Sequence, residues 1–570
     1  MRHMTTDLLF KNFHLLAGTP DGVKQLRQLI LQLAVQGRLV PQNPDDPPAS
    51  RLLQQIKAEK QRLIKEGKIK KQKPLPEIKP DEVPFELPKG WEWARLKYIS
   101  FDLGQKKPDM EFTYIDVASI ENNSGKVSRD LQVIQPQNAP SRARKIVLKN
   151  TVIFSTVRPY LLNIAVIEDD YSPEPIASTA FAILHPCSGI SSKFLFYYLR
   201  SNVFIDYVNS KMTGIAYPAI NDSNFFSGPI PIPPSPEQHR IVAKVDQLMA
   251  LCDELEARQE KQKVVHARLN KSALHVLTKS RTRDELSFNW TRLKDNFSLV
   301  FTTPESIQEL RSSILQLAVQ GRLVPQNPDD SPAQAVLEKA KPFFEGLVVQ
   351  KKLKKLQTLP AVTDQDKPFT LPTGWAWSRL GELIKVSSGD GLSSKDMIEG
   401  HIPVYGGNGI AGFHNKHNIE KQTLVIGRVG YYCGSVHITP DKAWVTDNAF
   451  ITYFNDHLLS IWFLKYLLNA TDFRKHDNAT AQPVISGAKI YPIIIGLPPL
   501  PEQHRIVSKV DQLMALCDEL EASLTRSQAD GQKLMQSVVV GCYPQPVISQ
   551  KMFNGSEKTY PHKIIFQESI

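Results

Sequence analysis

The chain has 570 residues, of which 41% are hydrophobic and 22% charged, a composition typical of globular proteins with several separate cores. Lysine and arginine exceed the acidic residues by 11, a mild positive balance that is compatible with a polyanionic partner without requiring one. Five cysteines without a C-x-x-C pair indicate a reducing cytoplasm, and no apolar run reaches the about 18 residues of a membrane span, so we expect neither disulfides nor a membrane partner nor secretion.

The N-terminal region reads as helix. Residues 22–73 carry a helical pattern, which is interrupted at GRLVPQNPDD because its glycine and prolines end one helix before the next begins. The basic segment KIKKQKPLPEIKP then looks like an exposed connector. We expect residues 1–84 to form a helical arm.

The next region, residues 85–235, reads as a separate domain with strands, loops and short helices. Runs such as IVLKNTVIFSTV and NIAVIED are rich in β-branched residues, and KFLFYYLRSNVF is a short helix. The domain opens on LPKGWEWARL, whose alternating Trp91 and Trp93 favour anchoring to the arm over stacking on bases.

A long helix follows, over residues 237–278, about 63 Å at about 1.5 Å per residue. Its apolar seam turns polar between residues 259 and 266 and is expected to recover at Leu269, Ala273 and Val276. Steps of four and three residues make the first part of the seam suitable for packing against a partner helix. The packing residues predicted there are Ile241, Val245, Leu248, Cys252 and Leu255.

The second half of the chain repeats the first. Residues 30–46 return unchanged at 314–330, and LPTGWAWSRL restores the tryptophan motif at the same offset of 284 residues. PEQHRIVAKVDQLMALCDELEA returns at an offset of 265 with one change, so the second copy is 19 residues shorter between these two motifs. Because the segments between the repeated blocks differ, the chain is a duplicated frame that holds two diverged inserts.

This repeat extends the expected organisation to the C-terminus. We expect central helices over 236–368, a second strand-rich domain over 369–500, a last long helix over 501–542 and a tail over 543–570 without assigned role. The fold class is α+β, with two mixed α/β domains. The second seam comprises Ile506, Val510, Leu513, Cys517 and Leu520.

We find no catalytic or metal motif. Walker A, H-E-x-x-H, G-x-S-x-G and the amino-methyltransferase tetrad are missing. GGNGIAG matches G-x-G-x-x-G formally, but the following FHNKHNIEKQ lacks a helical stripe, so we do not expect a dinucleotide loop. We expect a flexible glycine and asparagine loop beside Tyr405, either an ordinary turn or a place where the backbone approaches a ligand closely. His239 and His504 of PEQHR lack a ligand three or four residues away, which favours a helix-start histidine near Glu237 or Glu502 over a metal site.

Basic and polar residues of the inserts are the candidates for DNA contact, because arginine, lysine and asparagine supply phosphate contacts and donors to base edges. These residues are of interest because they lie in the regions that differ between the two copies. Each residue alone is equally compatible with a solvated or structural role. The candidates are Arg142, Arg144, Lys145, Arg158, Tyr160 and Lys211 in the first insert, and Lys395, Tyr405, Asn408, Arg428, Tyr431, Tyr432 and Asn448 in the second.

The whole pattern resembles the specificity (S) subunit of type I restriction-modification systems. The resemblance rests on LPxGWxWxRL before each insert, on PEQHRIV before each long helix, on the ILQLAVQGRLVPQ blocks and on IPVYGGNGIAGFHNK with VIGRVGYYCGSVH and WVTDNAF. It implies two target recognition domains that each read half of a bipartite DNA site, separated by antiparallel coiled-coil helices with pseudo-two-fold symmetry.

The resemblance also implies partners. A chain of this kind binds double-stranded DNA, two modification subunits and restriction subunits. It binds no cofactor itself, whereas the partners would use S-adenosylmethionine, ATP and Mg. Two other hypotheses stay open at this point, a stand-alone sequence-specific DNA-binding protein and a DNA methyltransferase or endonuclease in its own right.

Overall fold

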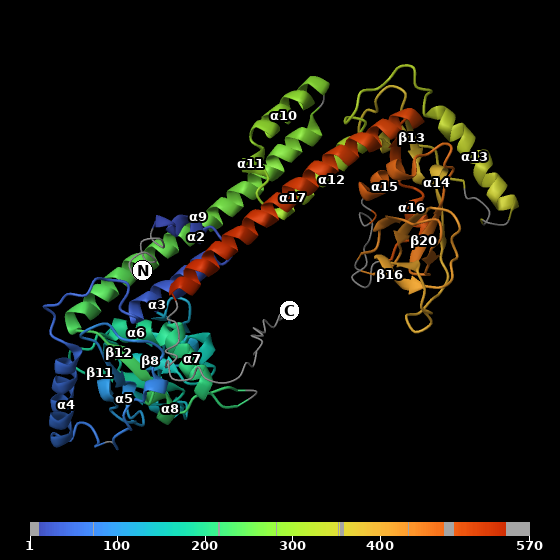
Figure 1. Ribbon diagram of the computed structural model, residues 1–570. Coiled ribbons are helices and arrows are strands. Elements are labelled where there is room, and N and C mark those ends of the chain that lie inside the picture. Colours follow the sequence, from blue (N-terminus) through green and yellow to red (C-terminus); the bar gives the residue numbers. More distant parts are fainter. Residues whose placement is uncertain are drawn as a thin grey trace, which may run out of the picture. The chain divides into compact units, whose positions relative to one another are not determined.

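The computed structural model describes residues 11–542, except 72, 215–216, 281, 351–352, 354–357, 431, 472 and 474–483. The expected tail over 543–570 and candidate Tyr431 lie outside the described residues. The chain divides into two compact units, unit 1 with residues 1–260 and 528–570, and unit 2 with residues 261–527. The expected mixture of helices and strands in two domains is confirmed (Figure 1).

The helical part of unit 1 surrounds the start of the long helix α9 (Figure 1). The turn expected at GRLVPQNPDD separates α3 from α4, and Gly37 takes the left-handed backbone there, with φ of 66°. The five seam residues from Ile241 to Leu255 are at most 7% exposed and share one core with α2, α3, Met535 and Val538. Two long helices are shared with unit 2: α9 (Ser235–Lys279) begins in unit 1, and α17 (Leu500–Cys542) begins in unit 2 and belongs to unit 1 from residue 528. The other helices of unit 1 are α2 (Phe13–Ala17), α3 (Gly22–Val35), α4 (Ala49–Lys65), α5 (Leu96–Ile99), α6 (Ser192–Arg200), α7 (Asn202–Lys211) and α8 (Asp222–Phe226).

Domain 1, residues 85–235, contains two four-stranded sheets with the orders β6-β3-β10-β7 and β2-β11-β8-β9. Helices α6 to α8 pack on the second sheet, where Phe154 of β8 contacts Phe204 and Phe225 at ring distances of 5.8 and 4.8 Å. Its strands are β1 (Glu92–Arg95), β2 (Ser100–Phe101), β3 (Phe112–Ile115), β4 (Ile120–Glu121), β5 (Lys126–Val127), β6 (Gln132–Ile134), β7 (Ala143–Ile146), β8 (Val152–Ser155), β9 (Ile164–Val166), β10 (Pro175–Ser178), β11 (Phe181–Pro186) and β12 (Pro229–Ile232).

Unit 2 contains domain 2, residues 369–500, and its own set of helices. Two of them, α10 and α11, follow α9 within the range 236–368 where central helices were expected, although the sequence did not give their separate bounds. The domain has sheets of order β14-β20-β17-β18 and β16-β15-β19. The elements are α10 (Arg283–Asp295), α11 (Phe297–Val300), α12 (Pro304–Val319), α13 (Gln334–Val349), α14 (Leu380–Leu383), α15 (Ile461–Asn469), α16 (Gly487–Ile490), β13 (Ala376–Arg379), β14 (Lys385–Ser388), β15 (Ile402–Gly406), β16 (Gly409–His414), β17 (Leu424–Gly427), β18 (Val436–Ile438), β19 (Trp444–Val445), β20 (Ala449–Tyr453) and β21 (Ile494–Leu497).

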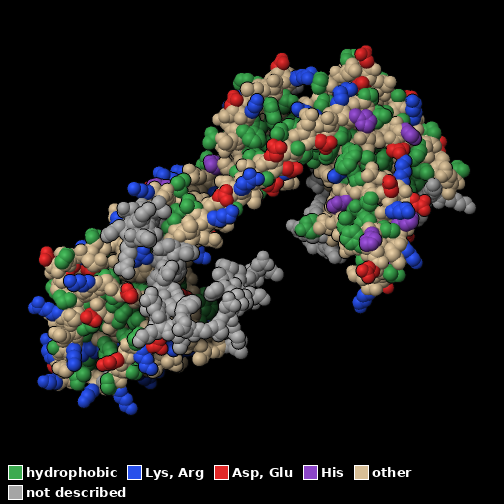
Figure 2. All heavy atoms as spheres, in the orientation of Figure 1, with side chains coloured by type: hydrophobic (Ala, Val, Ile, Leu, Met, Phe, Trp, Pro, Cys, Tyr) green, Lys and Arg blue, Asp and Glu red, His purple; other side chains and the backbone are tan. Residues whose placement is uncertain are grey.

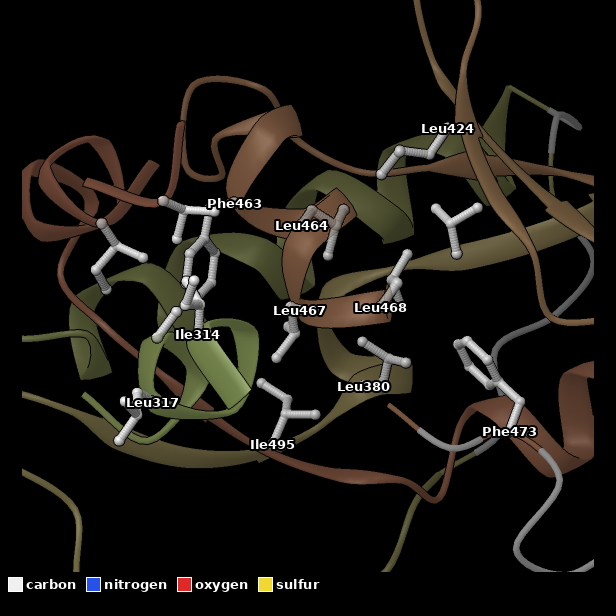
Figure 3. Packing of buried hydrophobic residues seen from close by; sticks show 14 of the residues in the cluster. Ile314, Leu317, Leu380, Leu424, Phe463, Leu464, Leu467, Leu468, Phe473 and Ile495 are labelled. Atoms are coloured by element: carbon white, nitrogen blue, oxygen red, sulfur yellow. The ribbon is translucent and has the colours of Figure 1, made fainter. Parts of the chain in front are cut away.

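The main core of unit 2 contains residues of helices α12 and α17 together with residues of domain 2. Figure 3 shows Ile314 and Leu317 of α12 beside Phe463 and Leu467 of α15, with Ile495 of β21 below them. In the same core, the predicted second-seam residues Ile506, Val510, Leu513 and Cys517 are at most 9% exposed, and Leu520 packs against its edge. The first long helix therefore begins in the core of unit 1, and the second begins in the core of unit 2.

The late part of the α9 seam differs from the prediction. Leu269 and Val276 are 42% and 45% exposed, whereas Asn270, Leu274 and Leu277 are at most 5% exposed. The buried stripe of α9 has moved by one position, because a straight helix of 3.6 residues per turn drifts away from a strict 3.5-residue repeat. In unit 2 this stripe packs against other elements than in unit 1. One of these is α11, since the Asn270 amide donates to the Val300 carbonyl at 3.4 Å.

Each domain is closed by a pairing of its first and last strands, β1 with β12 and β13 with β21. The two registers agree, because Arg95 lies opposite Pro229 and Arg379 lies opposite Ile494, in accordance with the sequence offsets of 284 and 265. The anchors of the two domains can therefore be compared residue by residue.

The buried glutamate of PEQHR anchors domain 1 to the arm. Glu237 of α9 is 1% exposed and accepts hydrogen bonds from the Trp91 indole and the Gln42 amide, both at 3.0 Å. The neighbouring Gln238 accepts the Ser191 backbone N–H at 2.8 Å, at the start of α6. Trp91 therefore serves as the anchor that the W-x-W spacing favoured.

The same anchor recurs in unit 2. Glu502 is 1% exposed and accepts from Gln326 at 3.0 Å, while Gln503 accepts the Ser460 backbone N–H at 2.9 Å, at the start of α15. Burial raises the pKa of both Glu237 and Glu502. His239 and His504 are exposed at the starts of the two long helices. The buried glutamates next to them accept hydrogen bonds from Gln42 and Gln326, and not from the histidines as expected.

Candidate nucleic-acid interface

Arg158 is exposed in the loop that follows β8. Its guanidinium lies over the Tyr217 ring, 5.0 Å from the ring centroid, and Tyr217 and Tyr160 are 71% and 48% exposed. Tyr217 was not among the sequence candidates, although it stands in YPAIN, one of the segments that echo between the copies. The result is an exposed cation stacked on one exposed ring, with a second exposed tyrosine two residues along the chain, an arrangement suited to phosphates or base edges.

The backbone holds this loop in a strained conformation. Arg158 has φ of 47°, in the left-handed region, and its N–H donates to the Pro218 carbonyl at 2.8 Å. A non-glycine residue in this region costs on the order of 1 kcal/mol, and such strain tends to occur at functional sites. Ala219 pairs with both Val157 and Thr213, which brings the exposed end of α7 with Lys211 next to the Arg158 loop.

Arg428 occupies the corresponding loop after β17. Its Nη1 donates to the Ser388 hydroxyl at 3.2 Å and to the Asp447 carbonyl at 3.4 Å, and its guanidinium lies 5.5 Å from the Phe450 ring centroid. Its backbone N–H donates to the Asn448 carbonyl at 2.9 Å, so two sequence candidates meet here. Arg428 is half-buried and hence better fixed than Arg158.

The two arginines are not equivalent. Val157 pairs with Ala219 in domain 1, and Val429 pairs with Val484 in the same place of domain 2. Arg158 follows its bridging valine, whereas Arg428 precedes its own. The two loops therefore have the same backbone pairing, but each places its arginine on a different side of the bridging valine.

The remaining candidates of domain 1 differ in exposure. Arg142 is exposed beside β7, and Arg144 is half-buried with Nη1 donating to the Ala143 carbonyl at 3.0 Å. Lys145 is 7% exposed and lies 3.5 Å from the Asp222 carboxylate, an ion pair within the domain. This position favours a structural role for Lys145.

In domain 2, Asn408 is exposed at the turn of the β15–β16 hairpin, which contains the glycine-rich segment. The segment leads into a strand, so the expectation of a turn instead of a dinucleotide loop is confirmed. Lys395 and Tyr432 are exposed as well. Tyr405 is only 5% exposed, and its hydroxyl donates to the Ile438 carbonyl at 3.3 Å, which makes it a core residue and corrects its assignment as a surface contact.

Positive charge gathers on the part of unit 1 that carries α4, as Figure 2 shows for one face of the molecule. Lys65, Lys68, Lys70, Lys71 and Lys73 are exposed there, as expected for the basic connector. Among the described residues, no group of three or more His, Cys, Asp or Glu side chains could hold a metal ion. No helix among these residues is long and apolar enough to cross a membrane.

Comparison with known proteins gives consistent results. Residues 94–266 and 372–527 match the family model described as the type I restriction modification DNA specificity domain. The specificity subunit of the type I restriction enzyme EcoAI of Escherichia coli is 34% identical over 544 residues, which cover 88% of this chain and 90% of that protein. The EcoEI specificity subunit of the same species is 31% identical over 546 residues, which cover 89% and 91%.

A similar protein is also found among solved structures. The crystal structure of the HsdS subunit from Thermoanaerobacter tengcongensis matches with a TM-score of 0.47 and 24% identity, over 81% of this chain and 98% of that chain.

Proposed function

This chain belongs to the family of type I restriction-modification specificity subunits, and from that premise we propose that domain 1 and domain 2 each read one half of a bipartite, asymmetric DNA site. The chain is a DNA sequence-specificity subunit, without catalysis of its own, that acts within the type I complex. The observation that supports two half-sites is the repeated glutamate anchor, which carries two domains with different loops.

We further propose that α9 and α17 form an antiparallel coiled-coil spacer in a pseudo-two-fold repeat. Helix α9 has 45 residues, about 67 Å at about 1.5 Å per residue. Two domains that read the same face of B-DNA must be about 34 Å apart or a multiple of that, and a continuous helix of this length provides such a spacing. The helix length, more than any side chain in the domains, would then determine the number of unread base pairs.

The proposed partners follow from the family. The helical surfaces would bind two modification subunits, which take S-adenosylmethionine and methylate adenine. Restriction subunits, which use ATP and Mg, would join this complex in the cytoplasm. The chain itself would contribute DNA selection and no cofactor-binding group.

Exchange of one domain tests the two-half-site proposal. Residues 85–235 are replaced by the first domain of another specificity subunit, and methylated adenines are mapped in a genome that also expresses the modification subunit. We expect one half of the methylated sequence to change and the other half and the spacing to stay. A change in both halves would contradict the proposal, and so would specific DNA binding or methylation by the purified chain without any modification subunit.

Arg158 and Arg428 are the sharpest candidates for base contact. We expect Arg158→Ala or Arg428→Ala to weaken DNA binding of the complex by about 10- to 100-fold, equivalent to about 1 to 3 kcal/mol, and to relax one position of one half-site. Affinity of the unchanged complex should also fall steeply with salt, because bound phosphates release counterions.

Electrophoretic mobility shifts on substituted DNA sites measure both effects. Lys395→Ala, which removes an exposed cation from the loop before β15, serves as the control, and the loss of a phosphate contact there should weaken binding to all sequences equally. An unchanged methylated sequence in both arginine variants would remove them as base readers.

A further inference from the structure

Helix α4 is joined to domain 1 through a lysine. The Lys60 Nζ donates to the backbone carbonyls of Lys97 and Ser100, at 2.6 and 2.7 Å. These carbonyls stand at the end of α5, where a helix leaves acceptors unpaired and attracts a positive charge. Phe101 follows Ser100 in the chain, and its ring stacks on His185 with 5.4 Å between the ring centroids.

In unit 2 the two residue types have changed places. The position of Lys60, 284 residues later, is Phe344 on α13, and the position of Phe101 is Lys385 on β14. The Lys385 Nζ donates to the Gly381 carbonyl, the equivalent of the Lys97 carbonyl. It also lies 5.3 Å from the centroid of the Phe344 ring, so the cation now comes from the domain and the ring from the helix.

The two sites have the same electrostatic character. Each ammonium group is half-buried, and burial lowers the pKa of both Lys60 and Lys385. Phe344 is 2% exposed, and a second ring, that of Tyr491, lies 5.0 Å from the Lys385 Nζ. Each site thus holds one cation on a backbone carbonyl. The nearby carboxylates of Glu59 and Glu382 act on these cations through space, and they accept hydrogen bonds from other groups, the Ser188 and Ser378 hydroxyls.

We propose that Lys60 with Phe101, and Phe344 with Lys385, are two complementary pairs that make each domain specific for its own arm helix. A domain on the wrong helix would meet either two lysines or two phenylalanines, and both combinations are unfavourable. Two partly desolvated ammonium groups repel each other, and two rings leave the carbonyl at the helix end without its donor. Each domain should then pack most stably on its own arm helix, so a domain that is exchanged without α4 or α13 keeps its DNA contacts and packs less firmly on the foreign helix.

This inference does not depend on DNA reading and is tested by local stability. In a chimera, residues 369–500 are replaced by a copy of residues 85–235, which brings Phe101 to face Phe344. Phe344→Lys is then made in both the original chain and the chimera. Exchange of the α13 backbone amides with deuterium, followed by mass spectrometry, reports the opening of the helix.

The same substitution should have opposite effects in the two backgrounds. Phe344→Lys should speed α13 exchange about tenfold in the original chain, where it meets Lys385, and slow it about tenfold in the chimera, where it restores the Lys60 arrangement. Phe343→Lys, at the half-buried neighbouring position, is the matched control and should act in the same direction in both. A common direction for Phe344→Lys would overturn the proposal.

A double substitution keeps the test valid if the chimera does not fold. Phe344→Lys with Lys385→Phe rebuilds the unit 1 pair within unit 2, and we expect exchange to return to within about threefold of the original rate. Additive effects of the two single substitutions would overturn the complementary pairing.

Discussion

Replacing Glu237 with alanine will lower the free energy of unfolding of unit 1 by about 3 kcal/mol, the largest effect that we expect from a single polar side chain. The substitution leaves the Trp91 indole N–H and one donor position of Gln42 buried without their acceptor. Each unpaired buried donor costs about 1 to 3 kcal/mol, and a cavity adds to this. Denaturant unfolding followed by tryptophan fluorescence measures the change.

Two companion variants make this measurement specific. Glu254→Ala, an exposed glutamate of the same helix, should change stability by less than about 0.5 kcal/mol. Glu502→Ala should weaken unit 2 in the same way as Glu237→Ala weakens unit 1, because Glu502 accepts from Gln326. Equal effects of Glu254→Ala and Glu237→Ala would show that the anchor contributes no stability.

The anchor also has a defined pH dependence. Burial raises the pKa of Glu237 above its ordinary value of 4.5, so the folded state holds the proton more tightly than the unfolded state. The contribution of this carboxyl to stability is therefore fully present below pH 4.5 and declines as the pH rises through the folded pKa. Glu237→Gln should remove this decline.

The second large effect concerns His185 of domain 1. Lowering the pH from 7 to 4 should cost domain 1 about 3 kcal/mol through this residue alone. Burial lowers the pKa of His185 from 6.5 to about 4, and its Nε2 has no hydrogen-bond partner among the described residues. The unfolded chain takes up a proton below pH 6.5 and the folded domain does not, so stability is lost as the pH falls from 6.5 towards 4.

Domain 2 supplies the control for this prediction. Phe454 stands at the position equivalent to His185, next to the echoing segments STAFAIL and DNAFITY, and a phenylalanine is tolerated there. His185→Phe should lose about 1 kcal/mol at pH 7, because the Thr151 hydroxyl loses its 2.9 Å contact with Nδ1. Urea unfolding at several pH values measures the free energy of unfolding of the original chain and of His185→Phe. The original chain should lose more of this free energy between pH 6.5 and pH 4, and an equal pH dependence in both proteins would contradict the prediction.

The repeat was sufficient to predict the two long helices and the anchoring role of Trp91, because these depend on motifs that occur twice. The repeat was not sufficient to predict which residues are buried in the second half of α9. Leu269 and Val276 continue the 3.5-residue period but are exposed, because the buried residues of a straight helix follow a period of 3.6. The bounds of α10 and α11 within the expected central helices could not be predicted either, because their apolar residues such as Leu293 and Val300 pack through tertiary contacts in the core of unit 2.

The sequence predicted which types of residue form the candidate site, but not which of those residues face solvent. Arg158 and Arg428 stand out as cations in echoing segments, and the structure places both in loops that follow β8 and β17. Tyr405 and Lys145 have equally suitable side chains but lie inside the domains. Whether a tyrosine or lysine faces solvent depends on strand register, and short strands with bulges give too weak a pattern to fix it.

The division of the chain into units has a consequence for its synthesis. Unit 2 is one uninterrupted segment, residues 261–527, so all of its residues are synthesised before residue 528, where the second part of unit 1 begins. Unit 1 is different, because its core needs Met535 and Val538, which are 1% and 3% exposed. The first unit to be started is thus the last to be completed, and a released chain that ends near residue 527 would hold a complete second unit and an open first one.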